Sequence, residues 1–566
     1  MKTNEHRDRG FLDEIAHRVM IERGLVPDFP GAALAELEKI KGPAIEPGTT
    51  ALRDARNLLW CSLDNDDSRD LDQLTAAESS DNGEVRILVA IADVDAIVKK
   101  QSAIDLHARQ NTTSVYTASE VFSMLPEKLS TDITSLNFDA DRLAVVIEMT
   151  LDLNGAIQRS SLYRAKVRNW ARLSYNSVAA WLDGSGPMPQ EIGAVIGMEG
   201  SIRLQDSMAQ KMKKLRHEQG ALVLETIEAK PVFLGDTLIN LEPDTRNRAK
   251  EIIEEFMIAT NGITVRFLAS KHFPAMRRVV RTPKRWDRIM AIASERGTTL
   301  PLKPDPKALE SFLAASKKTD PLHFPDLSLS IIKLLGRGEY VIQTPGNPNE
   351  GHFGLAVGDY AHSTAPNRRY PDLITQRLLK AAIEGRPVPY SIEELEILAR
   401  HCTEAEDAAQ KVERQLIKSA AAILLERRIG DRFDAIVTGA SDKGTWVRIS
   451  EPPLEGRLER GYEGLDVGQT LRVQLISADV ERGFINFKRY IVILRGVLFE
   501  HYSHERQHEN LLQGLGRRAT RGFLSRLAPQ FRQLGSADGI SRFPWIPLRR
   551  ARSKRAWPLG TELDWQ

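Results

Sequence analysis

The sequence predicts an α+β domain with a mixed sheet and surrounding helices, followed by a five-stranded β-barrel of the OB type. Two observations support this prediction. Between residues 49 and 428, apolar runs of strand length alternate with long segments of helical spacing. From residue 430 the pattern changes to short apolar runs separated by glycine-containing turns, which is typical of a small barrel.

Residues 1–48 precede this domain and are expected to form a small helical element. The segment 24–30 divides the element, because it contains one glycine and two prolines that interrupt helical spacing. Apolar residues recur at helical spacing on both sides of it, at Phe11, Ile15 and Val19 and then at Leu34, Leu37 and Ile40.

The large domain, 49–428, combines both kinds of pattern. Strands are expected at 85–91 and 143–149, and helices at 247–271 and 391–428. The last helix begins with the capping-box sequence Ser391-Ile392-Glu393-Glu394, in which a serine side chain accepts from a backbone N–H one turn on.

The barrel is expected at 430–489. Its five strands are predicted at 433–437, 444–449, 455–458, 471–476 and 482–487. Trp446 and Phe433 are candidates for stacking on nucleic-acid bases, although packing in the barrel core is an equally good interpretation of Phe433. The basic residues expected to follow a phosphate backbone are Arg432, Lys443, Arg448 and Arg472.

The last segment, 490–566, is basic and is expected to be poorly ordered. It has 13 Lys or Arg against 6 Asp or Glu, whereas the whole chain has a net charge of only +2. The body of the protein is therefore not uniformly basic, and any positive groove must be local. The sequence leaves open whether the tail is a nucleic-acid-binding arm or a stretch without a selected function.

Composition places the chain among large soluble proteins. It has 566 residues, 42% of them hydrophobic, and no apolar run approaches the roughly 18 residues of a membrane span. The charged start of the sequence is unlike a signal peptide. The only cysteines, Cys61 and Cys402, exclude a disulfide framework and a four-ligand zinc site of the usual kind. We expect a cytoplasmic monomer, with Cys61 buried at a strand end.

The most informative segment is 61–73, which carries five aspartates within nine positions directly after an apolar run. These residues are Asp64, Asp66, Asp67, Asp70 and Asp72. Like charges at this density repel one another unless a cation lies among them, so the loop indicates a metal site. Hard oxygen ligands of this kind suit Mg²⁺, with Mn²⁺ as the alternative.

Two other interpretations compete with the metal site. A solvated turn is compatible with 65–67 but does not account for Asp70 and Asp72, which enter the next element. A calcium-binding EF-hand loop needs glycine at its sixth position and a bidentate glutamate at its twelfth. The sequence has Arg69 and Thr75 at these positions, which excludes the calcium loop.

A second informative segment, 360–373, contains Arg368 and Arg369 beside prolines, and helical spacing follows it. The guanidinium fork of arginine suits phosphate recognition, so this pair is expected to face the carboxylate-bound metal across a phosphodiester. The alternative is two surface arginines at a helix start. It is disfavoured because the helix macrodipole repels cations there unless an anion compensates them.

Together these segments resemble the catalytic domain of the ribonuclease II / ribonuclease R family of exoribonucleases, in the family's order from about residue 50 to about residue 428. The barrel resembles the RNA-binding module that is repeated in the largest small-subunit ribosomal protein and that follows the catalytic domain in this family. Besides the aspartate loop, the likeness rests on the runs 91–94, 113–116, 124–130, 135–137, 142–144, 254–257 with Asn261, 352–355 and 365–372.

The resemblance implies a 3′-to-5′ hydrolytic exoribonuclease that degrades single-stranded RNA to nucleoside 5′-monophosphates, with Mg²⁺ or Mn²⁺ as cofactor. The resemblance implies that Asp64, Asp70 and Asp72 bind metal and take part in catalysis, and that Arg368 contacts the scissile phosphate. It also implies that Tyr116 stacks on a base, that Glu254 or Glu255 contacts a ribose, and that Glu413 helps to hold the terminal nucleotides. Arg369 and Trp446 join the candidate substrate-binding residues from the arguments above.

Three positions depart from the family pattern. Gln73 stands where the family usually has a fourth aspartate; its carbonyl can still coordinate a metal or hold a water, but it brings no charge and should weaken the second metal site. Ala90 replaces a common histidine, and Leu224 stands where ribonuclease II has a second stacking aromatic, so a looser grip on the 3′ end is expected. These departures leave open a catalytically lapsed RNA-binding protein on the same fold.

Overall fold

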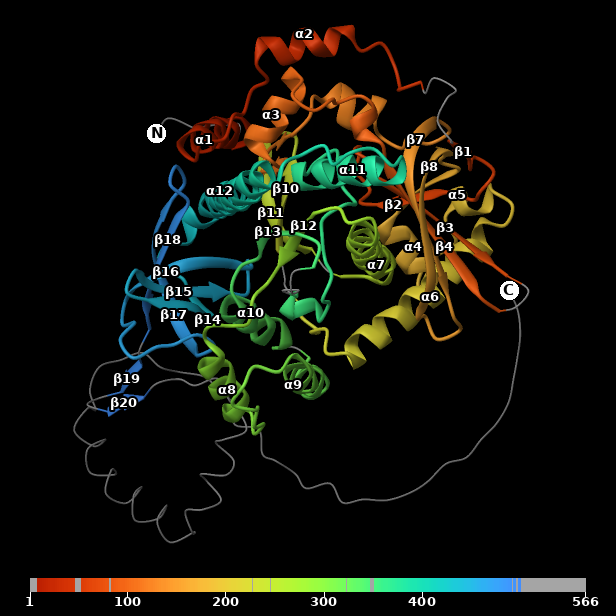
Figure 1. Ribbon diagram of the computed structural model, residues 1–566. Coiled ribbons are helices and arrows are strands. Elements are labelled where there is room, and N and C mark those ends of the chain that lie inside the picture. The colour runs from red at the N-terminus through yellow and green to blue at the C-terminus, as the bar shows by residue number, and fades with distance from the viewer. Residues whose placement is uncertain are drawn as a thin grey trace, which may run out of the picture. The chain divides into compact units, whose positions relative to one another are not determined.

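The computed structural model describes residues 8–45, 52–80, 83–225, 228–244, 246–321, 323–346 and 351–490, together with the backbone of 492–494 and 497–499. Figure 1 shows the course of the chain through these residues. The predicted tail at 490–566 lies outside the described residues, apart from Tyr490 and a short antiparallel pair, β19 (Val492–Leu494) and β20 (Val497–Phe499).

A seven-stranded mixed sheet forms the centre of the large domain, in the order β1-β8-β7-β4-β3-β2-β9. The pairs β1–β8 and β2–β9 are parallel and the other neighbours are antiparallel, so the predicted mixed sheet is confirmed. The strands are β1 (Arg53–Asp54), β2 (Cys61–Asp64), β3 (Gln73–Ser79), β4 (Val85–Ala92), β7 (Asp141–Leu151), β8 (Ile157–Arg168) and β9 (Ala171–Ser174).

Both faces of this sheet are buried under helices, as β4 shows most clearly. Its residues Ile87, Val89 and Ile91 pack in one hydrophobic cluster, whereas Leu88 and Ala90 pack in another on the opposite face. Side chains alternate across a strand, so a strand buried on both faces becomes one continuous apolar run. The covering helices are α3 (Ala103–Asn111), α4 (Tyr175–Leu182), α5 (Gln190–Gly193), α6 (Met198–Glu218), α7 (Arg248–Ser270) and α11 (Tyr370–Ile383).

The long helix α12 (Ile392–Leu425) connects the large domain with the barrel. Ser391 is its N-cap and accepts a hydrogen bond from the N–H of Glu394 at 3.1 Å, which confirms the predicted cap. The remaining helices of the large domain are α8 (Trp286–Glu295), α9 (Pro306–Thr319) and α10 (Phe324–Leu335). Three strand pairs complete it, β5 (Val115–Tyr116) with β6 (Val121–Phe122), β10 (Glu228–Leu234) with β11 (Thr237–Asp244) and β12 (Ala275–Val279) with β13 (Glu339–Gln343). Short helical turns occur at Val94–Ala96, Lys128–Ile133, Phe353–Leu355 and Glu426–Arg428.

The C-terminal strands close into a barrel in the order β14-β15-β16-β18-β17, which confirms the predicted five-stranded fold. Neighbours pair antiparallel except β16 and β18, which are parallel. Phe433 is 7% exposed and packs in the barrel core against Phe487, so its candidate role as a base-stacking residue was wrong. The strands are β14 (Arg432–Ser441), β15 (Gly444–Ile449), β16 (Leu454–Arg460), β17 (Thr470–Asp479) and β18 (Phe484–Arg489).

The N-terminal element contains two helices, α1 (Asp8–Glu22) and α2 (Gly31–Lys39), where apolar spacing predicts them. Cys61 is fully buried at the start of β2, as expected. Across the part of the chain that the structure describes, no helix is long and apolar enough to cross a membrane.

A buried ionic network connects the end of β4 to α11. Lys380 of α11 lies 2.7 Å from an oxygen of Asp93 and 2.8 Å from one of Asp95. Arg164 of β8 pairs with Asp93 at 3.0 Å, and Arg377 pairs with Asp95 at 3.1 Å. A buried charge without its partner is costly, so each of these ions depends on the others.

Candidate active site

The aspartate loop lies between β2 and β3, two adjacent strands of the central sheet. Asp64 ends β2, and Asp72 immediately precedes β3. Arg172 of β9 donates to the carbonyl oxygen of Ser68 at 2.6 Å, and Asn176 of α4 donates to Asp66 at 2.9 Å. These contacts anchor the loop at the sheet edge.

Asp72 is the most deeply buried member of the loop, with 1% of its surface exposed. Its Oδ1 accepts from the N–H of Asn367 at 2.9 Å. Its Oδ2 has no hydrogen-bond partner within the described residues and lies 3.4 Å from Nε of Arg368. Burial raises the pKa of Asp72 to about 8, and Asp70 adds to this effect although Arg368 opposes it. A cation at Oδ2 would supply the charge compensation that this carboxylate lacks.

Asp64 and Asp70 lie close enough to influence each other. Burial raises the pKa of Asp64, and the negative charge of Asp70 acts in the same direction. Asp70 accepts weak hydrogen bonds from Ser68 and from the hydroxyl of Tyr116, both at 3.4 Å. The three predicted catalytic aspartates therefore form one electrostatic group with Tyr116 at its edge.

The two predicted arginines face different partners. Arg368 is 41% exposed and lies against Asp72, whereas Arg369 donates to Asp372 at 2.8 Å. Asp372 also accepts from the N–H groups of Thr364 and Ala365, so it stabilises the turn before α11. The anion that compensates Arg369 at this helix start is therefore Asp372 of the same chain. Substrate binding by Arg369 stays a prediction.

Tyr116 and Glu413 are joined directly, although they are far apart in the sequence. The N–H of Tyr116 donates to Oε1 of Glu413 at 3.0 Å. The ring of Tyr116 remains partly exposed, with 42% of the residue accessible, beside Asp70. An exposed ring at the edge of a carboxylate group is suitably placed to stack on a base.

Other predicted substrate-binding residues lie elsewhere or have protein partners. Glu255 is buried and paired with Arg216 through both oxygens, and Glu254 pairs with Arg246 at 3.2 Å. Leu224 packs against the hydrophobic cluster of α8, α9 and α10. Trp446 is half-buried on the outer face of the barrel. Their roles toward a substrate stay predictions.

Tyr175, the first residue of α4, is a site residue that the sequence did not indicate. Burial raises its pKa, and the charge of Asp64 raises it further while Arg368 lowers it. Its position follows from the parallel pairing of β2 and β9, which aligns Asp64 with Ser174. That pairing joins strands more than 100 residues apart, so no local pattern could show it.

The oxygen donors of the site are of the type that binds a hard cation, although the carboxylates do not form a closed set of ligands. No group of three or more His, Cys, Asp or Glu side chains that could hold a metal ion occurs within the described ranges. The fit rests on the unsatisfied, buried Oδ2 of Asp72 and on the adjoining carboxylates of Asp64 and Asp70. Gln73 begins β3 opposite Ile91 and is partly exposed.

Two known domain families match this chain. The RNB domain matches residues 52–385, and the RNase II-type exonuclease C-terminal S1 domain matches residues 431–490. The chain therefore belongs to the RNB-domain family, and the resemblance to ribonuclease II and ribonuclease R is confirmed.

Curated relatives include ribonuclease R of Escherichia coli, 30% identical over 465 residues that cover 78% of this chain and 56% of that protein. Ribonuclease R of Thermotoga maritima is 29% identical over 497 residues, which cover 81% of this chain and 68% of that protein. The chain spans about half the length of several of the relatives it matches.

Solved structures of similar fold include Mycoplasma genitalium RNase R in complex with ribose methylated single-stranded RNA, with a TM-score of 0.75, 22% identity and coverage of 85% of this chain and 78% of that one. Yeast Ssd1, a pseudonuclease, has a TM-score of 0.63 and 18% identity over 79% of this chain and 55% of that one. The fold alone therefore does not distinguish an active nuclease from a lapsed one.

Proposed function

We propose that the chain is a divalent-metal-dependent hydrolytic exoribonuclease that removes nucleotides from the 3′ end of single-stranded RNA and releases nucleoside 5′-monophosphates. The observation that carries this proposal is the buried Asp72 carboxylate beside Arg368, with Asp64, Asp70 and Tyr116 adjoining it. Family membership supports the same activity.

In this mechanism Asp64, Asp70 and Asp72 would hold Mg²⁺, with Mn²⁺ as the alternative, and Gln73 would contribute its carbonyl. When bound there, a divalent cation would supply Lewis-acid activation of water and charge neutralisation at the leaving oxygen. Arg368 donates to the scissile phosphate and stabilises the charge that develops there. Tyr116 stacks on a base near the 3′ end, and Glu413 keeps the backbone of Tyr116 in place.

The barrel supports an RNA partner. Trp446 pairs across the strands with Arg457, and Arg457 pairs with Asn486, so these three residues form a row on the outer surface of β15, β16 and β18. OB barrels bind oligonucleotides on the face of their second and third strands, here β15 and β16. An aromatic ring, a guanidinium and an amide in one row suit a base and its phosphate. We propose single-stranded RNA as the partner of a cytoplasmic monomer.

A second candidate function is RNA binding on this fold without hydrolysis. Gln73 motivates it, because an amide replaces a carboxylate at the metal site. The catalytic proposal is favoured because the other three aspartates and Arg368 are present, and Asp64 and Asp72 each interact electrostatically with Asp70 and Arg368.

Degradation should require a free 3′ single strand and a divalent cation. Purified protein incubated with a 3′-tailed RNA and Mg²⁺ should release mononucleotides, and EDTA should stop the reaction. A blunt duplex should be resisted because a site with one stacking tyrosine accepts unpaired bases. Circular RNA of the same sequence is the control, and equal rates on linear and circular RNA would contradict exonuclease action.

Gln73→Asp should lower the Mg²⁺ concentration for half-maximal rate by about tenfold, because an added carboxylate strengthens cation binding. The measurement is the initial rate over a Mg²⁺ titration. Gln190→Asp, an exposed change on α5, should leave the titration unaltered. If the unmodified chain is inert at every Mg²⁺ and Mn²⁺ level and Gln73→Asp restores cleavage, the lapsed-enzyme alternative is correct.

A further inference from the structure

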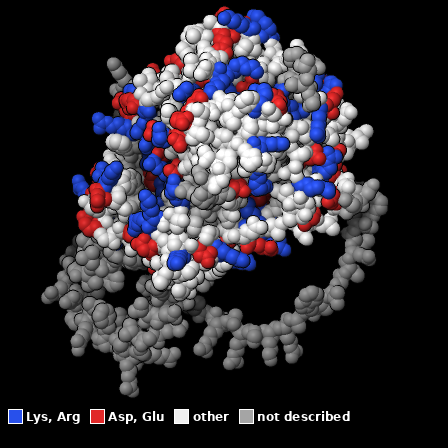
Figure 2. Space-filling view, in the orientation of Figure 1, with Lys and Arg blue, Asp and Glu red and all other residues white. Residues whose placement is uncertain are grey.

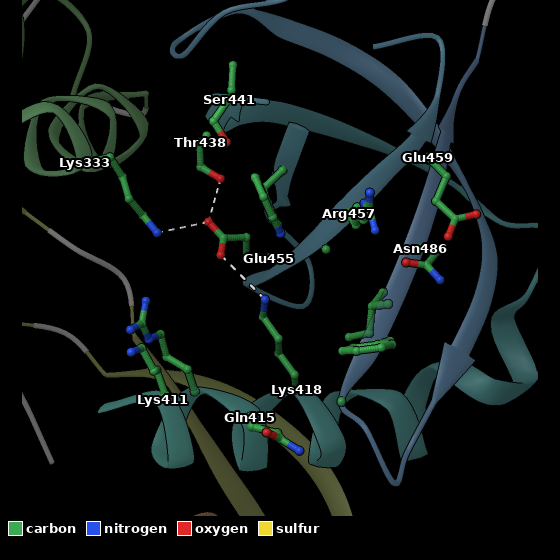
Figure 3. A pocket seen from close by; sticks show the side chains of 18 of the residues that line it. Lys333, Lys411, Gln415, Lys418, Thr438, Ser441, Glu455, Arg457, Glu459 and Asn486 are labelled. Atoms are coloured by element: carbon green, nitrogen blue, oxygen red, sulfur yellow. Dashed lines mark hydrogen bonds and ion pairs between the residues drawn. The ribbon is translucent and has the colours of Figure 1, made fainter. Parts of the chain in front are cut away.

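A cavity of about 870 Å³ lies between the barrel and the helices α10 and α12 (Figure 3). Glu455 of β16 lies in its wall and forms ion pairs with Lys333 of α10 at 3.1 Å and with Lys418 of α12 at 3.6 Å. These two lysines are thus held by an acidic partner. In Figure 2, Lys and Arg side chains gather over the barrel and the adjoining helices, with acidic residues among them.

The cavity carries more positive charge than its own acids compensate. Eight Lys or Arg residues line it, against two glutamates. Five of these cations, Arg23, Lys411, Arg414, Arg457 and Arg482, are exposed and have no recorded ion pair within the described part of the chain. Uncompensated cations converging on one concave surface favour a polyanionic ligand.

Two aromatic side chains specify the kind of polyanion. Trp446 and Phe484 both line the cavity, and Phe484 is 55% exposed. An acidic peptide would need only the cations. Exposed rings among phosphate-binding cations are typical of single-stranded nucleic acid, because every base presents a face on which a ring stacks.

The helix α1 lies outside both matched family regions yet contributes to this cavity, because Arg23 follows its last turn and lines the wall. Nearer its middle, Arg18 donates to the carbonyl oxygen of Glu481 in the β17–β18 turn at 3.2 Å. The helix therefore contacts the barrel directly.

The buried face of α1 also packs beside the active site. Its residues Leu12, Ile15 and Val19 share a hydrophobic cluster with Val115 and Val412. These two valines directly precede Tyr116 and Glu413, which are joined by a hydrogen bond. One helix thus supports the stacking tyrosine and supplies a cation to the cavity.

We propose that α1 with Arg23 forms a wall of an upstream RNA site, in which Arg23 binds a phosphate of the strand on the 5′ side of the nucleotides held at Tyr116. The inference rests on the proposed function, since it assigns the path of the same substrate. Lys411, Arg414, Arg457 and Arg482 bind neighbouring phosphates, while Trp446 and Phe484 stack on bases. A short RNA that fills only the active site does not reach Arg23.

The test compares RNAs of about 4 and about 16 nucleotides, the range of lengths that single-strand sites cover. Their affinities are measured by fluorescence anisotropy on the full chain carrying Asp72→Asn, so that the RNA survives. Arg23→Glu should lower the ratio of long-RNA to short-RNA affinity about tenfold, because one charge-assisted phosphate contact is lost and reversed. The salt dependence of long-RNA binding should also weaken by roughly 0.7 in log–log slope.

Lys39→Glu is the matched control, since Lys39 is exposed on α2 and does not line the cavity. It should leave the affinity ratio unchanged, and thermal melting should show that both variants are folded. An unchanged ratio and salt slope in Arg23→Glu would overturn the inference. So would displacement of the long RNA by polyglutamate as effectively as by competitor RNA, because the site would then be selective for acidic chains in general.

These outcomes are separate from those of the proposed function. If the unmodified chain degrades RNA and Arg23→Glu has no effect on the affinity ratio, only the upstream site is wrong. If the unmodified chain degrades nothing but the ratio still depends on Arg23, the upstream site stands and the exonuclease proposal fails. Absence of any RNA binding by the chain would overturn both.

Discussion

Asp72→Asn should reduce RNA degradation by about 10³-fold or more while leaving RNA affinity within about twofold. The substitution keeps the shape of the side chain and an oxygen that can accept from Asn367, but it removes the carboxyl group that faces Arg368 and that would hold the metal. Binding should persist because the barrel and the cavity are untouched. The measurements are single-turnover degradation of a 3′-labelled RNA and equilibrium binding of the same RNA.

Asp67→Asn is the matched control for this experiment. It makes the same chemical change in the same loop, but Asp67 is exposed, and its ion pair among the described residues is with Lys230 at 3.3 Å. It should retain nearly full activity, because a surface pair of this kind contributes little. Similar activity in Asp72→Asn and the unmodified chain would exclude the site assignment.

Lys380→Met should destabilise the protein by about 3–5 kcal/mol. The lysine side chain is 5% exposed, and its loss leaves the buried Asp93 and the partly buried Asp95 with one partner fewer. The methionine fills a similar volume, so the effect comes from charge and not from a cavity. Urea unfolding followed by circular dichroism measures the change in the free energy of unfolding.

Lys39→Met on the exposed surface of α2 is the control for this substitution and should change stability by less than about 0.5 kcal/mol. A loss for Lys380→Met no larger than this would contradict the network's role in stability.

The same network has a defined pH dependence. Burial raises the pKa of Asp95, but Lys380 and Arg377 lower it more, so the net shift is downward. The contribution of Asp95 to the free energy of unfolding is therefore present above its ordinary pKa of about 3.8 and is lost as the pH falls below that value. The pKa of Lys380 is shifted upward by Asp93 and Asp95 against the effect of burial. The contribution of Lys380 to the free energy of unfolding is present below the ordinary lysine pKa of 10.5 and is lost as the pH rises through the pKa of Lys380 in the folded protein.

Local pattern was sufficient for much of the fold. The continuous apolar run at 85–91 predicted a strand, and β4 (Val85–Ala92) is buried on both faces. The serine at 391 predicted the start of α12, because capping depends on residues within one turn. The five barrel strands appeared as glycine-punctuated runs for the same reason, since turns and strands are encoded by neighbouring residues.

Side-chain direction was harder to predict than element type. Phe433 and Trp446 are both aromatic residues on barrel strands, but Phe433 packs inside with Phe487 whereas Trp446 faces outward in line with Arg457. Arg368 and Arg369 are adjacent, yet only Arg368 lies against Asp72. Successive side chains diverge, so which one reaches a site depends on the path of the backbone in three dimensions.

The sequence by itself indicated the residues proposed for the site, because the aspartate loop and Arg368 are recognisable by residue type and Tyr116 by the resemblance to the family. Only the tertiary structure decided which groups meet. It places Tyr175 near Asp64, joins Glu413 to the backbone N–H of Tyr116, and packs α1 against the valines that precede Tyr116 and Glu413. The physical reason is that residue type and local spacing determine charge, capping and strand or helix formation. The approach of segments hundreds of residues apart depends instead on how the buried faces of the whole chain pack together.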